Sequence, residues 1–429
     1  MSKKILVWFR NDLRLHDNEM LVEAVAKSEG ILPVYCFDPR QFIKTPLFSL
    51  KTGVHRAQFL IENVAALRDA FQKMGGNLLL RIGKPEDILP ALVSQYHIDE
   101  VYHHREVAAE ETAVSTQVED QLWKLKVNLK HFIGHTLYNK EDLPFPVRDI
   151  PNAFNQFRKK TERDALVKPC FPQPQQISFL NADDWGGVPS LQTLFADTKL
   201  LSPKLRPDFK GGEAEALIHL ENFINDSEKL ALEAVPLKKQ EAVSKLSAWL
   251  AIGSLSPREV YWKLKEAEIH KTLKPYFSHV ILGLLWRDYF RFMFKKYGNT
   301  FFRQEGFKQE LNSSALRHTK ILQKWKNGET GQIVIDAIMQ ELNTTGYIAH
   351  DARLLTASYL VSKLRQSWVL GAAYFEEQLI DYCPASNWGN WANVAGVGSD
   401  QRLNVSFDFE KQLKAFDAKA IYTHPVKAD

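Results

Sequence analysis

The chain has little cysteine and no long hydrophobic run, and both absences narrow its class. Only three of its 429 residues are cysteines, and they lie far apart. An odd, scattered set argues against a disulfide framework and fits a reducing compartment. The only early apolar run, residues 5–9, stops at Arg10 and is too short for a signal peptide or a membrane span. We expect a cytoplasmic globular protein, a monomer without membrane contact.

An excess of charge of one sign is also missing. The 55 Lys and Arg against 51 Asp and Glu leave a net charge of only +4. So small an excess does not identify a nucleic-acid-binding protein, and any case for one must rest on local clusters. The length predicts two to three domains. What the chain has in quantity is aromatic residues, with 10 Trp, 13 Tyr and 26 Phe.

Short apolar runs alternate with helical patterns through the first third of the chain. Apolar strands separated by helices predict βαβ units with a parallel sheet buried on both faces. Asp17 is the expected N-cap of the first helix. The prediction is a doubly wound α/β domain over residues 1–134, with strands at 5–9, 31–37, 78–82, 100–103 and 129–133 and helices at 18–26, 55–74, 86–96 and 110–127.

The middle of the chain is rich in proline. Residues 144–207 hold nine of the 19 prolines, a density that disfavours long helices and central strands. We expect a connector over 135–212 with one helix near 153–161. Residues 213–429 predict an all-α domain, interrupted by a loop rich in Gly, Asn and Trp at 383–397. Its expected helices are 213–224, 257–267, 276–297, 315–327, 336–342, 353–364 and 372–379.

The first strand-to-helix turn, residues 8–17, contains no glycine. It therefore cannot form a glycine-rich dinucleotide or phosphate loop. Arg10 and Arg14 in this turn either face a ligand or pair with Asp12 and Asp17 to shape it. No metal site is predicted anywhere in the chain.

A short segment of the helical domain has the groups that suit a phosphate. Ser244, Lys245, Leu246 and Ser247 combine hydroxyls, backbone N–H groups and an ammonium group near an expected helix start. On its own the signal is weak, because a helix start with serine is also an ordinary cap.

A second segment, residues 286–297, places basic and aromatic side chains side by side. Helical spacing puts Arg287, Arg291 and Lys295 on one stripe, beside a stripe of aromatic residues. Such a pair of stripes favours binding to a nucleic-acid backbone and its bases. The alternative is a core helix with a solvated basic face.

The stretch 383–400 gives the most specific local signal. It holds Asn387, Trp388, Asn390 and Trp391 among several glycines. Glycine lets the backbone approach a flat ligand closely, and asparagine amides both donate to and accept from a heterocycle. The stretch therefore predicts a site for a flat heterocyclic ligand.

Several motifs occur in an order typical of one family. They are WFRNDLRLHDN at 8–18, SKLS at 244–247, LSPR at 255–258, LWRDYFRF at 285–292 and SNWGNW at 386–391. Together they resemble the photolyase/cryptochrome family, and the last motif with DPRQF at 38–42 resembles its DASH-type branch. The resemblance extends over about residues 4–420.

The resemblance implies a fold, cofactors and a function. The family joins an α/β domain, which can carry a 5,10-methenyltetrahydrofolate antenna, to a helical domain that binds FAD. Blue light then drives an electron from reduced flavin to a pyrimidine dimer flipped out of DNA. For this chain the resemblance implies blue-light electron transfer and binding to DNA, preferably single-stranded. It also implies the repair of pyrimidine dimers.

The resemblance also assigns roles to individual residues. The implied cofactor-binding residues are Ser244, Lys245, Leu246, Ser247, Arg287, Arg353, Asp381 and Asn387. The implied electron-transfer residues are Trp391, Trp368 and Asn387. Contacts to nucleic acid are expected at Trp286, Arg291, Lys295 and Trp388. Glu106 is expected to contact the antenna; the alternative is a solvated glutamate that opens a helix.

Six sites depart from the family pattern. They are Gly283 in place of a dimer-binding glutamate, His350 with Asp351, Cys383, Leu230, Val405, and Ala315 in place of the outermost tryptophan of the electron-transfer chain. These departures leave two alternatives to repair. One is a photoreceptor or nucleic-acid-binding protein without repair activity, and the other is a degenerate scaffold with weak or no flavin binding.

Overall fold

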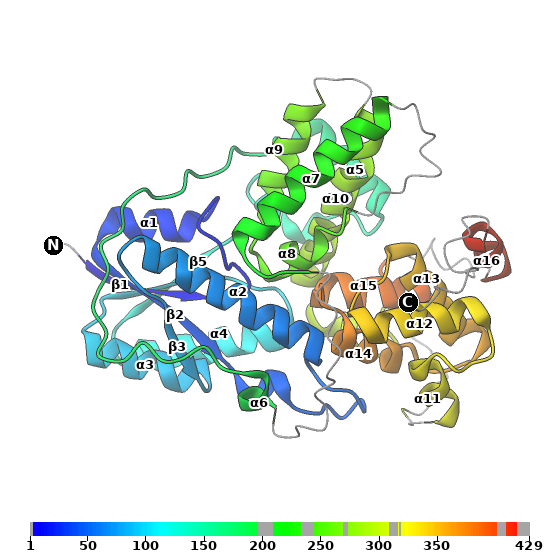
Figure 1. Cartoon of the computed structure of the whole chain (residues 1–429), viewed down its shortest axis with the longest axis horizontal. Coiled ribbons are helices and arrows are strands. Elements are labelled where there is room, and N and C mark those ends of the chain that lie inside the picture. The colour runs from blue at the N-terminus through cyan, green and yellow to red at the C-terminus, as the bar shows by residue number, and fades with distance from the viewer. Residues whose placement is uncertain are drawn as a thin grey trace.

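The computed structural model describes residues 3–195, 209–232, 244–268, 273–308, 316, 319–400 and 409–417. An α/β domain lies beside a helical domain, and a long connector joins the two (Figure 1). The predicted fold class is confirmed.

The α/β domain is built on a five-stranded parallel sheet. Its strand order is β3-β2-β1-β4-β5. The chain adds β2 and β3 on one side of β1 and then returns to add β4 and β5 on the other side. All five predicted strands are present. The strands are β1 (Lys3–Phe9), β2 (Ser28–Phe37), β3 (Leu79–Ile82), β4 (Glu100–His104) and β5 (Asn128–Phe132).

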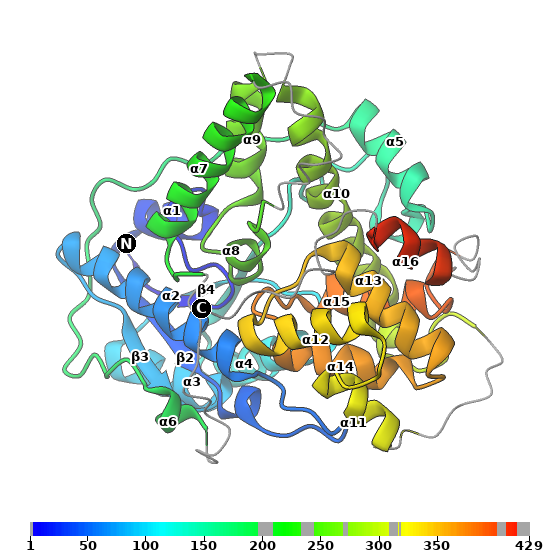
Figure 2. The same ribbon diagram turned by 45° about the vertical axis from the view of Figure 1, so that its right-hand side comes forward.

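Both faces of the sheet are buried, as the apolar strands require. Along β1, Val7 and Phe9 point into the core shared with α1 and α2, while Leu6 and Trp8 point into the core shared with α3 and α4. Figure 2 shows the helices on the two sides of the sheet. The helices are α1 (Glu19–Lys27), α2 (Val54–Lys73), α3 (Pro85–Tyr96) and α4 (Ala109–Lys124).

The connector carries the predicted helix, α5 (Phe154–Asp164), and a short helix, α6 (Leu191–Leu194). The α5 helix packs against the longest helix of the helical domain, α10 (Lys274–Tyr297), because Phe154 stacks on Trp286 with ring centres 3.5 Å apart. The connector is therefore held against the helical domain by aromatic packing.

The helical domain supplies the remaining helices. None of the helices within the described ranges is long and apolar enough to cross a bilayer. A π-helical turn at Tyr359–Lys363 continues α13. The helices are α7 (Glu213–Leu232), α8 (Ser247–Ile252), α9 (Pro257–Ala267), α10, α11 (Lys320–Asn327), α12 (Ile333–Thr345), α13 (His350–Ser358), α14 (Trp368–Gln378), α15 (Pro384–Val394) and α16 (Phe409–Asp417).

The predicted loop at 383–397 is wrong, since most of it is the helix α15. Pro384 occupies the first turn of the helix, where its missing N–H costs nothing. Gly389 is there for packing rather than for a turn: a Cβ atom at this position would lie 2.3 Å from the Phe290 ring of α10. The residues that suggested a loop are those that let α15 pack closely in the core.

The N-cap of α1 is Asn18, not the predicted Asp17. The Asn18 side chain accepts a hydrogen bond from the Leu21 N–H at 3.1 Å. The Asp17 carboxylate is turned instead toward Arg258 of α9, at 2.6 and 3.0 Å. Asp17 therefore joins the two domains.

Arg14 also lies at the domain interface. It is fully buried and donates to the carbonyl groups of Gly253 in the helical domain, at 2.9 Å, and of Gly134, at 2.8 Å. Of the two alternatives for this arginine, shaping the turn is the one observed, although carbonyl groups rather than aspartates are its partners.

Candidate functional site

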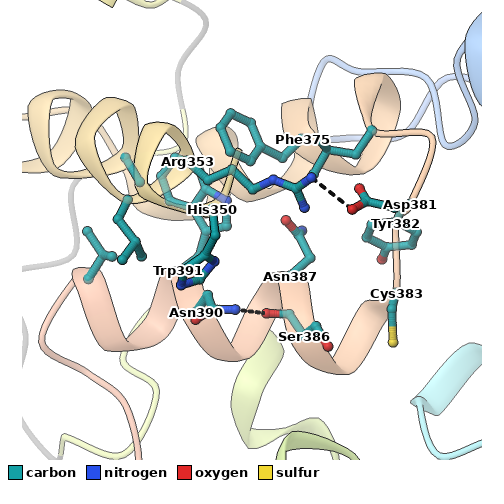
Figure 3. A pocket seen from close by; sticks show the side chains of 14 residues that line it. His350, Arg353, Phe375, Asp381, Tyr382, Cys383, Ser386, Asn387, Asn390 and Trp391 are labelled. Carbon is teal, nitrogen blue, oxygen red and sulfur yellow. Dashed lines mark hydrogen bonds and ion pairs between the residues drawn. The ribbon is translucent and has the colours of Figure 1, made fainter. Parts of the chain in front are cut away.

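A cavity in the helical domain lies between α13, α14 and α15 (Figure 3). The cavity is narrow, with a volume of about 60 Å³. Its lining residues include His350, Arg353, Phe375, Asp381, Tyr382, Cys383, Asn387, Asn390 and Trp391. Three residues of the predicted cofactor site, Arg353, Asp381 and Asn387, are thus brought together.

An ion pair forms one wall of the cavity. Arg353 of α13 donates through Nη2 to Asp381 Oδ2 at 2.8 Å, and through Nε to the Ile348 carbonyl at 2.9 Å. The side chain of Asp381 is only 2% exposed, yet its Oδ1 has no hydrogen-bond partner. A buried carboxylate oxygen without a donor is costly, and it is available to a ligand N–H.

Asn387 of α15 adds a second acceptor. Its Nδ2 donates to the Ala372 carbonyl at 3.0 Å. A carbonyl can only accept, so this contact leaves the Asn387 Oδ1 free to accept a hydrogen bond from another group. In Figure 3 the Asn387 amide lies between the Arg353–Asp381 pair and α15.

The phosphate-suited segment precedes α8. Lys245 has a left-handed backbone with φ of 51°. Such a conformation is uncommon for a residue other than glycine, and here it turns the chain into the helix. The Ser244 carbonyl accepts from His219 at 2.8 Å, which fixes the segment to α7.

Tyr347 connects this segment with the cavity. Its hydroxyl lies near Ser247, and its ring lies under the Arg353 guanidinium, 5.3 Å from the ring centre. Burial raises the pKa of Tyr347 to about 12, so the phenol is neutral. Tyr347, Arg353 and Asp381 therefore form one set of contacts, and Ser247 lies near its Tyr347 end.

These groups fit FAD. A diphosphate suits the segment before α8, and a flat ring system with N–H donors suits the acceptors Asp381 Oδ1 and Asn387 Oδ1. Arg353 would lie at the ring system of FAD, and Ser247 would lie at its diphosphate.

Comparison with known proteins gives the family. Residues 5–175 match the family model described as DNA photolyase, and residues 280–425 match the FAD binding domain of DNA photolyase. The protein Cryptochrome DASH of Gloeobacter violaceus is 39% identical over 426 residues, covering 98% of this chain and 85% of the relative. This chain belongs to the cryptochrome DASH family.

A second relative is also a cryptochrome DASH, and the solved structures belong to a cryptochrome and a photolyase. Cryptochrome DASH of Xenopus laevis is 39% identical, covering 98% of this chain and 82% of the relative. The structure of a Synechocystis cryptochrome matches with a TM-score of 0.89 and 36% identity, covering 98% of this chain and 88% of that one. An archaeal photolyase from Sulfolobus tokodaii, solved with two FAD molecules, matches with a TM-score of 0.78 and 27% identity. The match covers 97% of this chain and 88% of that one. The predicted family and the presence of an FAD-binding domain are confirmed.

The predicted basic stripe on α10 does not face solvent. Arg291 is 7% exposed and pairs with Glu106 of the α/β domain at 2.8 Å. Arg287 donates to the carbonyls of Leu250, at 2.9 Å, and of His135. Arg291 therefore belongs to the domain interface, and Arg287 is bonded to the helical domain and to the start of the connector. Only Lys295 is exposed.

The expected base-stacking residues also lie elsewhere. Trp388 is buried, with 4% of its surface exposed in this cryptochrome DASH protein. Its ring faces that of Trp368, with ring centres 5.8 Å apart. Trp286 is partly buried and stacks on Phe154. The prediction that Trp388 contacts nucleic acid is wrong, since α15 is an interior helix.

Glu106 follows β4, as predicted, but its surroundings differ from both expectations. It is 2% exposed, Oε1 accepts from Asn11 at 3.0 Å, and Oε2 accepts from Arg291 at 2.8 Å. Burial alone would raise its pKa, but nearby His135 and Arg291 more than reverse this, so the pKa lies below its usual range. The solvated alternative is wrong, and the contact of Glu106 to a folate antenna stays a prediction.

The family departures are distributed over the helical domain. Gly283 is exposed on α10, His350 and Cys383 line the cavity, and Leu230 is partly buried on α7. Ala315 and Val405 lie outside the described residues. The sequence analysis missed Tyr382, although this residue directly follows Asp381, an expected site residue.

The expected electron-transfer tryptophans are buried. Trp391 lies against Phe375 and Trp325, with ring centres 5.0 and 6.2 Å away. Trp368 is 5% exposed and has Trp388 as its neighbour. Trp391 lines the cavity, whereas Trp368 does not.

Proposed function

We propose that this cryptochrome DASH protein binds FAD in the cavity and uses blue light for one-electron transfer, with DNA as its macromolecular partner. The observation that carries the proposal is the set of contacts that joins Tyr347, Arg353 and Asp381, with Ser247 near the Tyr347 hydroxyl. It links a segment that suits a diphosphate with a cavity that suits a flat heterocycle. FAD has both parts.

The residues of the cavity would bind and orient the ring. The flavin, when bound, supplies light absorption and one-electron chemistry. Asp381 Oδ1 and Asn387 Oδ1 would accept hydrogen bonds from ring N–H groups, while the bond from Arg353 keeps the Asp381 carboxylate in one orientation. Buried aromatic side chains such as Trp391 exclude water from the ring.

The visible absorption spectrum of the purified protein tests flavin binding. We expect the two visible bands of oxidised flavin, or their appearance after reconstitution with FAD. Asp381→Asn should weaken binding while leaving the fold intact, as judged by circular dichroism. A colourless wild-type protein that takes up no FAD contradicts the proposal and favours the degenerate scaffold.

A small group of surface cations supports the DNA proposal better than the buried stripe does. Lys295, Lys140 and Arg105 are exposed. Burial lowers the pKa of Lys295, and the charges of Lys140 and Arg105 lower it further, so the three lie within electrostatic reach of one another. Glu141 offsets part of this charge. Clustered cations suit the phosphate groups of single-stranded and of double-stranded DNA.

Salt-dependent binding to oligothymidine tests the role of this cluster. Lys295→Gln should reduce the slope of log affinity against log salt by about 1, as loss of one phosphate contact requires. Lys229→Gln is the matched control, because Lys229 is an exposed lysine on α7. Equal slopes for wild type and Lys295→Gln would remove this lysine from the interface.

A second candidate, DNA binding without efficient repair, is favoured by Gly283. No side chain stands at this exposed position of α10, and a Cβ atom there would meet no atom within 4 Å. The carboxylate that the family resemblance places here is absent, so discrimination of a dimer should fall. Illumination of the reduced protein with a dimer-containing oligothymidine decides between the two candidates.

A further inference from the structure

One arginine of the α/β domain reaches the wall of the cavity in the helical domain. Arg56 lies on α2, and its guanidinium carbon is 4.5 Å from the centre of the Tyr382 ring. Tyr382 and its chain neighbour Asp381 both line the cavity (Figure 3). The positive charge of Arg56 therefore lies against a wall residue, although Arg56 itself does not line the cavity.

The start of α2 is bound firmly to the helical domain, and this fixes the position of Arg56. The Gly53 N–H donates to the Glu377 carbonyl of α14 at 2.8 Å, and the Leu50 N–H donates to the Glu377 carboxylate at 3.0 Å. A Cβ atom at Gly53 would lie 2.4 Å from that carbonyl oxygen, so only glycine permits the approach. Arg56 follows within the first turn of α2, and its place beside the cavity is set by these backbone contacts.

Arg56 is a cation without an ion-pair partner. Its Nη2 donates to Thr52 Oγ1 at 3.0 Å and to the Lys51 carbonyl, while its Nε is buried and has no hydrogen-bond partner. The arginine ion pairs in the part of the chain that the structure describes all involve other arginines. Burial lowers the pKa of Arg56, and the charges of Glu376 and Asp381 counteract part of this shift. A buried charge that is not neutralised costs folding free energy, and such a cost is typical of a functional site.

A cation beside the cavity favours whichever form of a ligand carries more negative charge. Reduction by two electrons gives the flavin ring a negative charge that the oxidised ring lacks, as long as N1 stays unprotonated. Charges interact over longer distances in a protein interior than in water, so the cation need not touch the ring to act on it. Arg56 is therefore placed to stabilise reduced flavin more than oxidised flavin.

We propose that Arg56 is a positioning residue of the flavin site, which supports the Tyr382 wall and raises the reduction potential of the bound flavin by its charge. The inference rests on the proposed binding of flavin in the cavity. Arg56 neither gives nor takes an electron or a proton. The helical domain supplies the residues that line the cavity, and the α/β domain supplies a positive charge that no carboxylate neutralises directly.

The reduction potential of the bound flavin tests the role of this charge. Flavin content is measured first by visible absorption, and the potential is then measured by titration against a dye of known potential. Arg56→Gln removes the charge and keeps an amide donor. We expect the affinity for reduced flavin relative to oxidised flavin to fall about tenfold, which for a two-electron couple lowers the potential by about 30 mV. Arg56→Lys keeps the charge and should retain most of the wild-type potential.

Two further variants complete the test. Arg68→Gln is the matched control, because Arg68 is a partly buried arginine on the same helix that bonds Asn77 at 2.9 Å and the Gly186 carbonyl at 2.7 Å. Its loss should leave the potential unchanged. Thr52→Val removes one acceptor of the Arg56 guanidinium with little change in volume, and it should lower the potential by less than Arg56→Gln does.

The outcomes separate this role from the proposed function. A wild-type potential in Arg56→Gln overturns the inference and leaves flavin binding standing. An equal shift in Arg56→Lys also overturns it, because packing rather than charge would then be the cause. If Arg56→Gln does not fold, Thr52→Val decides: a lower potential supports the inference, and an unchanged one contradicts it. If the wild-type protein takes up no flavin, both the inference and the proposed function are overturned.

Discussion

The domain interface and the cavity both contain buried arginine–carboxylate pairs, but they leave different atoms free. At the interface, Asp17 accepts from Arg258 through both oxygens, and Ser256 and the Phe171 N–H add further bonds. In the cavity, Asp381 accepts from Arg353 through one oxygen and leaves the other without a partner. A carboxylate that is fully bonded within the protein stabilises the fold, whereas one with a free buried oxygen is available to a ligand.

The largest effect is expected from removing a charge at the interface. Asp17→Asn preserves the shape of the side chain and tolerates its positive φ of 44°, but leaves the buried Arg258 without a counter-charge. Breaking a buried pair in this way costs about 3–5 kcal/mol of unfolding free energy. Urea denaturation measures it.

An exposed pair supplies the control for this variant. Asp164 bonds Arg163 on the surface of α5, so Asp164→Asn should leave the urea midpoint unchanged. If Asp17→Asn behaves in the same way, the distinction between the interface and an ordinary surface pair is wrong.

Asp288 of α10 sharpens the comparison, because it is a buried carboxylate with a free oxygen outside the cavity. It is fully buried, and its Oδ2 accepts from the Tyr138 N–H while Oδ1 has no partner. Burial raises its pKa to about 7 against an ordinary value of 3.8. Between these two values the folded state holds a proton that the unfolded state has lost, so stability falls as the pH rises.

This gives a prediction for the variant Asp288→Asn. From pH 5 to pH 8 the wild type should lose about 3 kcal/mol of unfolding free energy at this site, and the variant should not. Urea denaturation at the two pH values measures the difference. Glu106→Gln is the control. Because the pKa of Glu106 is lowered, its contribution to stability is lost only as the pH falls below the ordinary pKa of a glutamate, so this variant keeps the wild-type slope between pH 5 and 8.

A smaller effect is expected in the cavity. Arg353→Gln removes the charged bond to Asp381, and a hydrogen bond that involves a charged group contributes about 1.5–3 kcal/mol. FAD affinity should therefore fall by about 10- to 100-fold, as measured by titration of flavin fluorescence. Arg158→Gln on the surface of α5 serves as the control. Unchanged affinity in Arg353→Gln would place the ring away from this ion pair.

The sequence predicted the sheet domain better than the site, for a physical reason. Buried parallel strands are continuous apolar runs, so β1 and its neighbours can be recognised from local pattern. The helix α15 is hidden because Gly389 and its tryptophans serve contacts with α10 that no local pattern shows. Long-range packing decides such positions.

The same limit applies to the charged residues. Helical spacing placed Arg287 and Arg291 on one face of α10, but the sequence could not indicate that the α/β domain covers that face. Arg353 and Asp381 were assigned through the family resemblance, whereas the local pattern at 383–400 had already indicated Asn387, and the three residues come from separate elements. Tyr382 belongs to no motif, and its place in the cavity wall is seen only in the folded chain.

The smallest change in stability is expected at Gly283, where the structure leaves room for a side chain. Glycine within an exposed helix is less favourable than an ordinary residue by roughly 0.5–1 kcal/mol, and an added Cβ atom meets no neighbour. Gly283→Glu should therefore raise the unfolding free energy by about that amount. Any change in function must then come from the new carboxylate rather than from a disturbed fold. With flavin content equal in both proteins, the variant should repair dimer-containing oligothymidine faster than the wild type under blue light. Rapid and complete repair by the wild type would show that the missing carboxylate is not needed, and binding without efficient repair would be the wrong description of this chain.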